Sequence, residues 1–440
     1  MKDKIRIGCG AGFSGDRLDP SIVLVERGDL NYLVLECLAE RTIALAQKRK
    51  LQDPSKGYDP LLERRIESLI DLLVSRDVCL ITNMGAANPV AAAEKVVEIA
   101  KSRKVKIKVA AITGDDVFDR IDFSVRSMET NQPISSAGKP VSANAYLGAD
   151  GIIEALKAGA NVIITGRVAD PSLFIAPMMH EFGWALDDFD LLGKGTVIGH
   201  LMECAGHITG GYFADPGKKD VPDMAHLGHP FVDVYRDGSG VISKPEDTGG
   251  IINLLTAKEQ LLYEVVNPFE YYTPDVIADF TSVHLNQIGP NVVKVEGGSG
   301  KERPATFKVS VGYHAFYLGE GEITYGGHNA LGRAKLAGDI IRERLRAEFP
   351  DVRVDLIGHS SIHGQEISAA SSPYEVRVRV VGTSPSPAKA ALVGEDVEAL
   401  YTNGPGGGGG VRKSVTEVIG IVSTLISREK ATHKLTLLQS

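Results

Sequence analysis

The sequence lacks the features that mark several large classes of protein. It has four cysteines, Cys9, Cys37, Cys79 and Cys204, and no CxxC pair, which argues against a disulfide framework or a zinc site and suits reduced thiols. No apolar stretch approaches the ~20 residues that a helix needs to cross a bilayer. The first residues, MKDKIRIGCG, contain no secretory apolar segment. We therefore expect a cytoplasmic protein without a membrane partner.

The net charge of the chain also argues against one class of function, nucleic-acid binding. The net charge is −8 at pH 7, and no dense basic run is present, so we expect no nucleic-acid partner. Apolar residues make up 43% and charged residues 24% of the 440 residues, as in ordinary globular proteins. A chain of this length is longer than a domain with a single hydrophobic core usually is. We expect an N-terminal domain over residues 1–199 and a second domain over residues 200–440.

The first 200 residues alternate between short apolar runs and helical patterns. The runs at 32–35, 78–82, 107–112 and 162–165 are rich in β-branched residues, which is typical of strands buried on both faces. Helices are expected at 89–101, after the cap Asn88, and at 150–157. The alternation predicts an α/β fold with a wound, mainly parallel sheet and helices on both faces.

The sequence pattern changes after about residue 199, where glycine–histidine turns become frequent. Strands are expected at 231–235, 276–284, 305–311, 322–325, 352–357 and 375–381, and helices at 251–263, 329–346, 386–392 and 411–427. The mixture predicts a second α/β or α+β domain. The polar, unperiodic segment 128–140 is expected to be a loop over a site.

Five consecutive glycines, Gly406–Gly410, are the most unusual local feature. Several backbone N–H groups can converge on one anion where side chains are absent, above all before a helix. We assign substrate binding to Gly406, Gly407, Gly408, Gly409 and Arg412, ahead of the helix expected from Val411. The alternative is a flexible linker. The run is not a P-loop, because Arg412 interrupts that motif.

Polar and glycine residues collect where the expected strands end. They are Gly10, Gly12, Glu36, Asn83, Gly85, Asp115, Arg167 and Asp170. Ligands of wound sheets bind at this edge, so Gly10, Gly12, Asn83, Gly85, Asp115 and Arg167 are predicted to bind substrate. The G-x-G-x-x-G pattern from Gly10 is a weak dinucleotide motif, because residues 16–20 break any long helix. Arg167 needs an anionic partner, either Asp170 or the substrate, while Asp170 before Pro171 also suits a helix cap.

Two further groups of residues are candidates for acid–base or nucleophilic catalysis. Glu36 and Glu40 are four residues apart and would share a helical face; an apolar setting would fit Glu36 for acid–base work, and a surface cluster is the alternative. The stretch GHLMECAGHITGG contains His200, Glu203, Cys204 and His207; on a helix, His200, Glu203 (or Cys204) and His207 would fall along one side. Cys204 with His207 suits a thiolate nucleophile, whereas a buried cysteine with turn-capping histidines is the plain alternative. No spacing specifies a metal site, and no cofactor is identified.

Long blocks of the sequence resemble the acyclic terpene utilisation family. They include GAGFSGDR from Gly10, YLVLECLAERT from Tyr32, ITNMGAANP from Ile81, the stretch from Ser142 to Leu173, GHLMECAGHITGGYFADP from Gly199, and YTNGPGGGGGVR from Tyr401. The resemblance runs almost end to end and implies bacterial catabolism of acyclic terpenes and branched acids, beside enzymes of acyl-CoA thioesters. It brings no assigned reaction. Asp150 departs from the expected family pattern, which puts a terpenoid substrate in doubt.

Together these features predict a catabolic enzyme acting on an acyl-CoA or another anionic carboxylate, as a hydrolase, hydratase or lyase. The expected catalytic residues are Glu36, Cys204, His207 and Asp170. The alternatives are a non-catalytic acyl-CoA or anion-binding subunit, and a cysteine-dependent amide or ester hydrolase. The expected partners are the small anionic substrate and further copies of the chain in a homo-oligomer.

Overall fold

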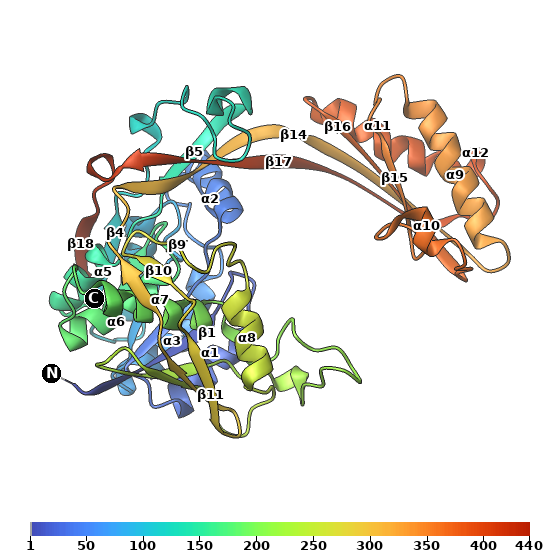
Figure 1. Ribbon diagram of the computed structural model, residues 1–440. Coiled ribbons are helices and arrows are strands. Elements are labelled where there is room, and N and C mark those ends of the chain that lie inside the picture. Colours follow the sequence, from blue (N-terminus) through green and yellow to red (C-terminus); the bar gives the residue numbers. More distant parts are fainter. Residues whose placement is uncertain (1) are drawn as a thin grey trace. The chain divides into compact units, whose positions relative to one another are not determined.

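The chain folds as two compact units in a computed structural model that describes residues 2–440 (Figure 1). Unit 1 contains residues 2–134, 141–312 and 421–440, and unit 2 contains residues 135–140 and 313–420. The second unit is thus an insertion in the first. This division differs from the one expected between residues 199 and 200, which both lie inside helix α7 (Phe189–Glu203).

A large mixed sheet forms the centre of unit 1. Its central strands are parallel and run in the order β1-β2-β3-β6-β4. They are β1 (Lys4–Ala11), β2 (Tyr32–Leu35), β3 (Cys79–Thr82), β6 (Val162–Thr165) and β4 (Lys108–Thr113). Strands β2 and β6 are buried at every position, as their unbroken apolar sequence requires. The strands expected from the first 165 residues are therefore confirmed.

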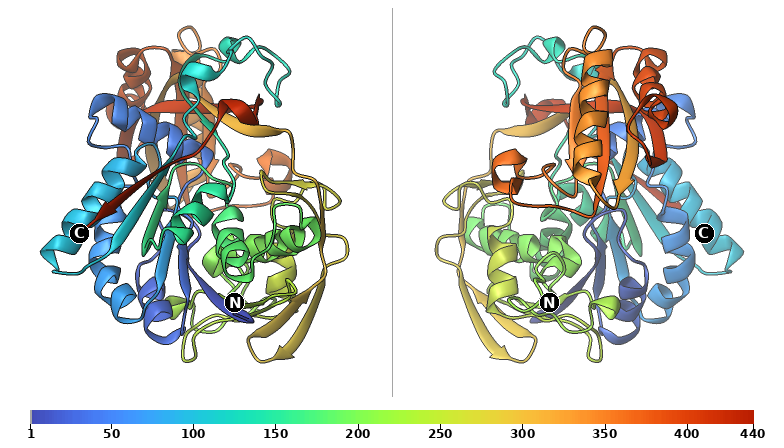
Figure 2. Two further views of the ribbon diagram at one scale, coloured as in Figure 1. Left: turned by 90° about the vertical axis from the view of Figure 1, so that its left-hand side faces the viewer. Right: turned by 90° about the vertical axis from the view of Figure 1, so that its right-hand side faces the viewer.

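Antiparallel strands extend this sheet on both sides to ten strands. On one side follow β7 (Phe231–Tyr235), β8 (Gly240–Ser243), β12 (Val292–Glu296) and β11 (His284–Gly289), and on the other lies β18 (Lys434–Gln439). The expectation of a mainly parallel sheet therefore holds only for its centre. A small sheet joins β13 (Ser299–Lys301), β10 (Ile277–Asp279) and β9 (Tyr271–Tyr272). Figure 2 shows β18, in dark red, beside β4.

The helices of unit 1 form two packed groups. Helices α1, α3 and α4 pack on one another in one group, and α5, α6 and α7 in the other. The helices are α1 (Asp19–Arg27), α2 (Glu40–Gln52), α3 (Leu62–Ser75), α4 (Pro89–Ser102), α5 (Asp150–Lys157), α6 (Ser172–Phe182), α7 and α8 (Leu254–Leu262). Asn88 caps α4 by accepting a hydrogen bond from Ala91 N–H, as expected. A wound arrangement with helices on both faces stays a prediction.

Unit 2 has an antiparallel sheet in the order β15-β16-β14-β17, with the chain order β-α-β-β-α-β of a split βαβ motif. Its elements are β14 (Thr306–Gly326), α9 (Ala330–Leu345), β15 (Arg353–Ile357), α10 (Gly364–Ser368), β16 (Glu375–Ser384), α11 (Pro387–Glu398), α12 (Leu400–Asn403) and β17 (Gly409–Ser427). Both β14 and β17 continue into unit 1, as does β5 (Lys139–Ala145), which pairs with β14. The helix expected at 411–427 is wrong, because this segment is β17; its β-branched residues suit a strand.

The segment 128–140, expected to be one loop, contains the short 3-10 turn Ile134–Ser136 and the start of β5. Within residues 2–440, no helix combines the length and the apolar character required to cross a membrane.

Candidate functional site

The carboxyl ends of β2, β3, β4 and β6 place polar side chains at one edge of the sheet in unit 1. Glu36 follows β2, Asn83 follows β3, Asp115 lies two residues after β4, and Arg167 lies two residues after β6. All four side chains are buried. Hydrogen bonds link Asn83 to Glu36 and Arg167 to Asp115. The strand-end group expected from the sequence is thus brought together at these positions.

Glu36 is a buried carboxyl held at one oxygen. Its Oε1 accepts hydrogen bonds from Asn83 Nδ2 at 2.8 Å and from Leu38 N–H at 2.9 Å. Asn83 Oδ1 accepts from Cys37 N–H, so the amide also fixes the turn after β2. Burial, followed by the negative charge of Asp170, raises the pKa of Glu36 well above its usual value, against the opposing effect of Arg167. The surroundings of Glu36 therefore favour the protonated form of its carboxyl.

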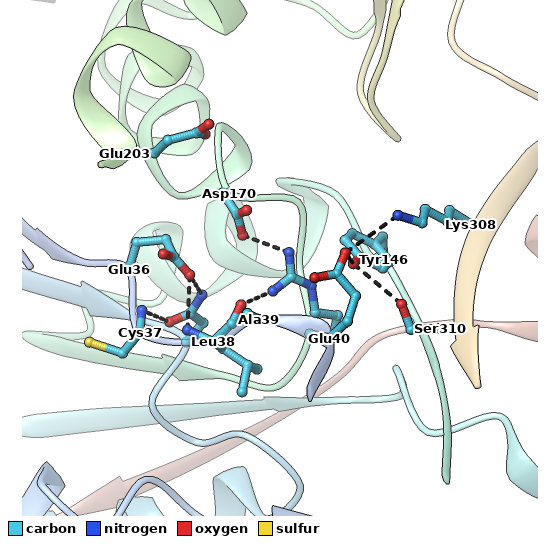
Figure 3. Close-up of polar contacts among 12 residues, drawn as sticks. Glu36, Cys37, Leu38, Ala39, Glu40, Tyr146, Asp170, Glu203, Lys308 and Ser310 are labelled. Carbon is cyan, nitrogen blue, oxygen red and sulfur yellow. Dashed lines mark hydrogen bonds and ion pairs between the residues drawn. The ribbon is translucent and has the colours of Figure 1, made fainter. Parts of the chain in front are cut away.

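Arg167 connects the network around Glu36 to a second carboxyl. Its guanidinium donates to Asp170 Oδ1 at 2.7 Å and to the Leu38 carbonyl, and it stacks on the Tyr146 ring with 4.2 Å to the centroid (Figure 3). Asp170 thus forms the ion pair that the sequence suggested. It does not cap α6 with its side chain, because the N-cap residue of that helix is Pro171.

The Asp170 carboxyl is less strongly perturbed than that of Glu36. Burial raises the pKa of Asp170 and the charge of Arg167 lowers it, and the side chain is 31% exposed. Carboxyls with different environments can divide the roles of acid and base. Asp170, paired with a cation, is the group that ionises more readily.

Asp115 supports Arg167 through the backbone. Its Oδ2 accepts from Arg167 N–H at 3.0 Å and from Asn144 Nδ2 at 2.9 Å. Burial raises the pKa of Asp115 to about 6. Because both contacts serve the protein itself, they fix the turn after β6; a role of Asp115 in substrate binding stays a prediction.

Glu40 does not share a helical face with Glu36, because α2 begins at Glu40 and Glu36 precedes it outside any helix. Glu40 accepts from Tyr146 Oη and pairs with Lys308 Nζ at 3.4 Å. Although burial raises the pKa of Glu40, these contacts and Arg167 outweigh it and hold the pKa at about 2. Ser310 Oγ donates to Tyr146 Oη at 3.3 Å. Glu40 is therefore an anion that orients Tyr146 beneath Arg167.

Another carboxyl, Glu203, lies at the C-terminal end of α7 beyond Asp170 (Figure 3). His200 Nδ1 and Glu203 Oε1 are 3.0 Å apart. Burial lowers the pKa of His200 to about 4, and burial with the charge of Asp170 raises that of Glu203 well above its usual value. Burial therefore disfavours the charged form of both groups. The aromatic rings of Tyr271 and Phe280 pack against His200 at 5.5 Å.

Four buried polar atoms of this region have no hydrogen-bond partner within residues 2–440. They are Asn144 Oδ1, Arg167 Nε, His200 Nε2 and Glu203 Oε2. Buried polar atoms are nearly always satisfied, so orphaned ones mark a place for water or a ligand. Their presence beside Glu36 and Asp170 makes this cluster the candidate active site.

Cys204 and His207 do not form a dyad in the part of the chain that the structure describes. Helix α7 ends at Glu203, so the expectation of one helix carrying all four residues is wrong; His207 lies in a following 3-10 turn. His207 Nδ1 bonds to Gln260 Oε1, and its ring packs on Tyr263. Burial raises the pKa of the Cys204 thiol, with Glu203 adding to the effect. A thiolate at this position is disfavoured at pH 7.

Close packing explains why glycine occupies these positions at the strand ends. A Cβ on Gly12 would lie 2.4 Å from the Cys204 carbonyl carbon, and one on Gly10 would lie 2.7 Å from Ser21 Oγ. A Cβ on Gly85 would lie 2.5 Å from the Thr165 carbonyl oxygen. These contacts account for the glycines without a ligand, and their role in substrate binding stays a prediction. Helix α1 begins only at Asp19, which does not match a dinucleotide loop.

The glycine run belongs to unit 2, whereas Glu36 and Arg167 belong to unit 1. Gly406, Gly407 and Gly408 precede β17, which begins with Gly409 and Gly410, so the helix N-terminus that motivated an anion site is missing there. Gly407 has φ of +76°, and Gly408 packs on Ile323 and Tyr325; a Cβ on Gly406 or Gly409 would meet nothing within 4 Å. The helix-dipole argument therefore no longer supports binding by Gly406, Gly407, Gly408, Gly409 and Arg412.

Sequence reasoning missed the residues that complete the cluster from a distance. Asn144 and Tyr146 come from β5 and the turn after it, and Lys308 comes from β14. None of them follows a strand of the central sheet, so the strand-end argument could not include them. His200 and Glu203 were visible as a pair spaced by three residues, the spacing at which helical side chains meet.

No group of three or more His, Cys, Asp or Glu side chains in residues 2–440 is arranged to hold a metal ion. The family described as "Acyclic terpene utilisation family protein AtuA" matches residues 5–437. Neither a curated protein nor a solved structure matches the chain.

Proposed function

The chain belongs to the acyclic terpene utilisation family, and on that premise we propose that it is a catabolic enzyme moving protons on an acyl-CoA or another carboxylate substrate. The reaction is of the hydratase or lyase type. Glu36 acts as the general acid, and Asp170 acts as the base or as the anion that holds Arg167. The residues around them bind the substrate and exclude water.

The observation that carries this proposal is the pair of buried carboxyls with raised pKa values beside an ion pair. Glu36 and Glu203 both have strongly raised pKa values, whereas Asp170 faces the charge of Arg167. Carboxyls whose environments separate their pKa values are the usual means of running acid and base steps at one pH. Such an arrangement has little structural benefit, because buried carboxyls without full pairing destabilise a fold.

The orphaned Arg167 Nε supports a substrate with a carboxylate or thioester oxygen. One N–H of Nη2 is used by Asp170 and one of Nη1 by Leu38, and Tyr146 stacks on the plane of the guanidinium. A fixed N–H donor of a cation stabilises charge that develops on an oxygen during enolisation. In a water addition of this kind, the substrate α-carbon takes a proton from Glu36, hydroxide from water enters at the β-carbon, and the water's remaining proton goes to Asp170. A proton then returns from Asp170 to Glu36 through solvent.

Cysteine-dependent hydrolysis is the weaker candidate. The neutral Cys204 thiol and the separate partner of His207 leave the nucleophile unactivated. The non-catalytic subunit remains an outcome of the experiment.

The test is incubation of the protein with α,β-unsaturated and β-hydroxy acyl-CoA thioesters and with the corresponding free acids. Mass spectrometry follows gain or loss of one water. We expect turnover by the wild type, its loss in Glu36→Gln, and its retention in Glu67→Gln, whose side chain is exposed on α3. Saturable binding without any product would establish a binding subunit. Full turnover by Glu36→Gln would remove Glu36 from its assigned role.

A further inference from the structure

The edge strand β17 of unit 2 has exposed residues in its middle part. β17 is the last strand in the sheet order β15-β16-β14-β17, so one of its edges faces away from β14. Residues 412–416 are exposed at five consecutive positions. A strand normally buries alternate residues, and natural proteins rarely leave a long strand edge open. Figure 1 shows β17 as a continuous ribbon beside β14.

The adjacent part of β14 is also incompletely covered. Residues 313–318 are half-buried at six consecutive positions, and they include Tyr313, Phe316 and Tyr317. Tyr317 and Leu318 pair with Ser384 and Thr383 of β16, so this part of β14 already has a neighbour on the side away from β17. A further strand on the open edge of β17 would add backbone hydrogen bonds and cover this part of the sheet.

One contact indicates which backbone groups of β17 point outward. Val411 N–H donates to Tyr401 Oη, a partner outside β14. Backbone groups of a strand alternate in direction, so residues an even number away share that orientation. Lys413, Val415 and Glu417 therefore direct their N–H and C=O groups to the open edge.

We propose that a second copy of this chain pairs antiparallel along β17, with Val415 opposite Val415 of the second copy. The twofold axis then passes through a hydrogen-bonded pair of valines, and the four-stranded order β15-β16-β14-β17 continues into the same strands of the second copy in reverse.

Charge selects this register among the possible ones. Antiparallel pairing about Val415 places Lys413 opposite Glu417 of the second copy, twice by symmetry, and Ser414 opposite Thr416. Opposite charges in facing positions stabilise a strand pair. A shift of the axis to Ser414 or to Thr416 places each of the two charged residues opposite an apolar one. Lys413 Nζ already contacts Glu398 of α11 at 2.5 Å, and its three donors allow a second carboxylate.

The first test is covalent capture. Facing residues of a hydrogen-bonded antiparallel pair have Cα atoms about 5.5 Å apart, within the range of a disulfide. Val415→Cys is expected to form a disulfide-linked dimer of twice 47.0 kDa under mild oxidation. Ser414→Cys is the matched control, because Ser414 faces Thr416 rather than itself. Equal or preferential cross-linking of Ser414→Cys would overturn the register.

The second test removes pairing without unfolding unit 2. Proline at 415 eliminates one outward N–H and leaves the ladder to β14 in place, so Val415→Pro is expected to be a folded monomer by circular dichroism and light scattering. Lys413→Glu and Glu417→Lys are each expected to lose the dimer, and the double variant to regain it. Glu398→Gln, which removes only the contact within one chain, is expected to remain dimeric.

A monomeric wild type, or a dimer that persists in Val415→Pro, would overturn the proposal. Recovery of the dimer only in the double variant distinguishes a facing charge pair from a general effect of charge.

Discussion

Substitution of Glu36 by glutamine is expected to change how the stability of unit 1 depends on pH. Glutamine has the shape of the protonated carboxyl, and its Oε1 can keep the hydrogen bonds from Asn83 and Leu38. The folded pKa of Glu36 is raised, while the unfolded value is about 4.3. Between these two values the folded state holds a proton that the unfolded state has released. The free energy of unfolding of the wild type therefore falls as pH rises through this window.

The size of the effect follows from proton linkage. One such group contributes about 1.4 kcal/mol per pH unit inside the window and nothing further above the folded pKa. The difference in the free energy of unfolding, Glu36→Gln minus wild type, is expected to increase with pH at that slope. His200, whose lowered pKa gives a slope of the opposite sign below pH 6.5, is present in both proteins. Its contribution cancels in the difference.

The assay is urea unfolding from pH 5 to pH 8, followed by the fluorescence of Trp184. This residue is the single tryptophan of the chain, and it is buried in unit 1, so its signal reports the unit that contains Glu36. Glu67→Gln, on the exposed side of α3, is the control for the loss of a carboxylate far from Glu36. A difference for Glu36→Gln that is flat from pH 5 to pH 8 would refute a raised pKa of Glu36.

Further outcomes follow from the same contacts. Arg167→Met is expected to destabilise unit 1 by about 3 kcal/mol, because it leaves Asp170 without its partner; urea unfolding measures this, and the double variant with Asp170→Asn should recover part of the loss. Iodoacetamide is expected to label Cys204 more slowly at pH 7 than it labels an unperturbed thiol, since burial raises the pKa of Cys204; rapid labelling, located by peptide mass spectrometry, would restore the nucleophile hypothesis. Gly12→Ala is expected to cost roughly 1–3 kcal/mol through overpacking against the Cys204 backbone. Gly406→Ala, whose Cβ meets nothing within 4 Å, is expected to change stability little, and equal thermal shifts for the two alanine variants would contradict the packing account.

The sequence predicted the centre of unit 1 well because its strands carry an unambiguous pattern. β2 and β6 are apolar at nearly every position and end in polar residues, and the parallel arrangement then brings Glu36 and Arg167 to one edge. The antiparallel strands were harder to place in a sheet. β11 has alternating, largely exposed residues, and nothing local indicates that β18 pairs with β4, more than 300 positions away.

The segment after the glycine run shows why a prediction from local sequence was wrong in the C-terminal part of the chain. Val411, Val415, Val418 and Ile419 fit a helical spacing, but the segment is β-branched and continues the sheet of unit 2. Partner strands decide such ambiguous cases, and they lie elsewhere in the chain. The prediction that Glu36 and Glu40 share a helix was wrong for the same reason. The apolar run up to Leu35 forms strand β2, and helix α2 begins only at Glu40.

The pairing of β18 with β4 has a consequence during protein synthesis. β4 emerges from the ribosome early, yet its neighbour β18 follows roughly 320 residues later, after the whole of unit 2. At translation rates of about 5–20 residues per second, the edge of β4 stays open for some tens of seconds. Chains cut short before Lys434 leave that edge of β4 without its antiparallel neighbour.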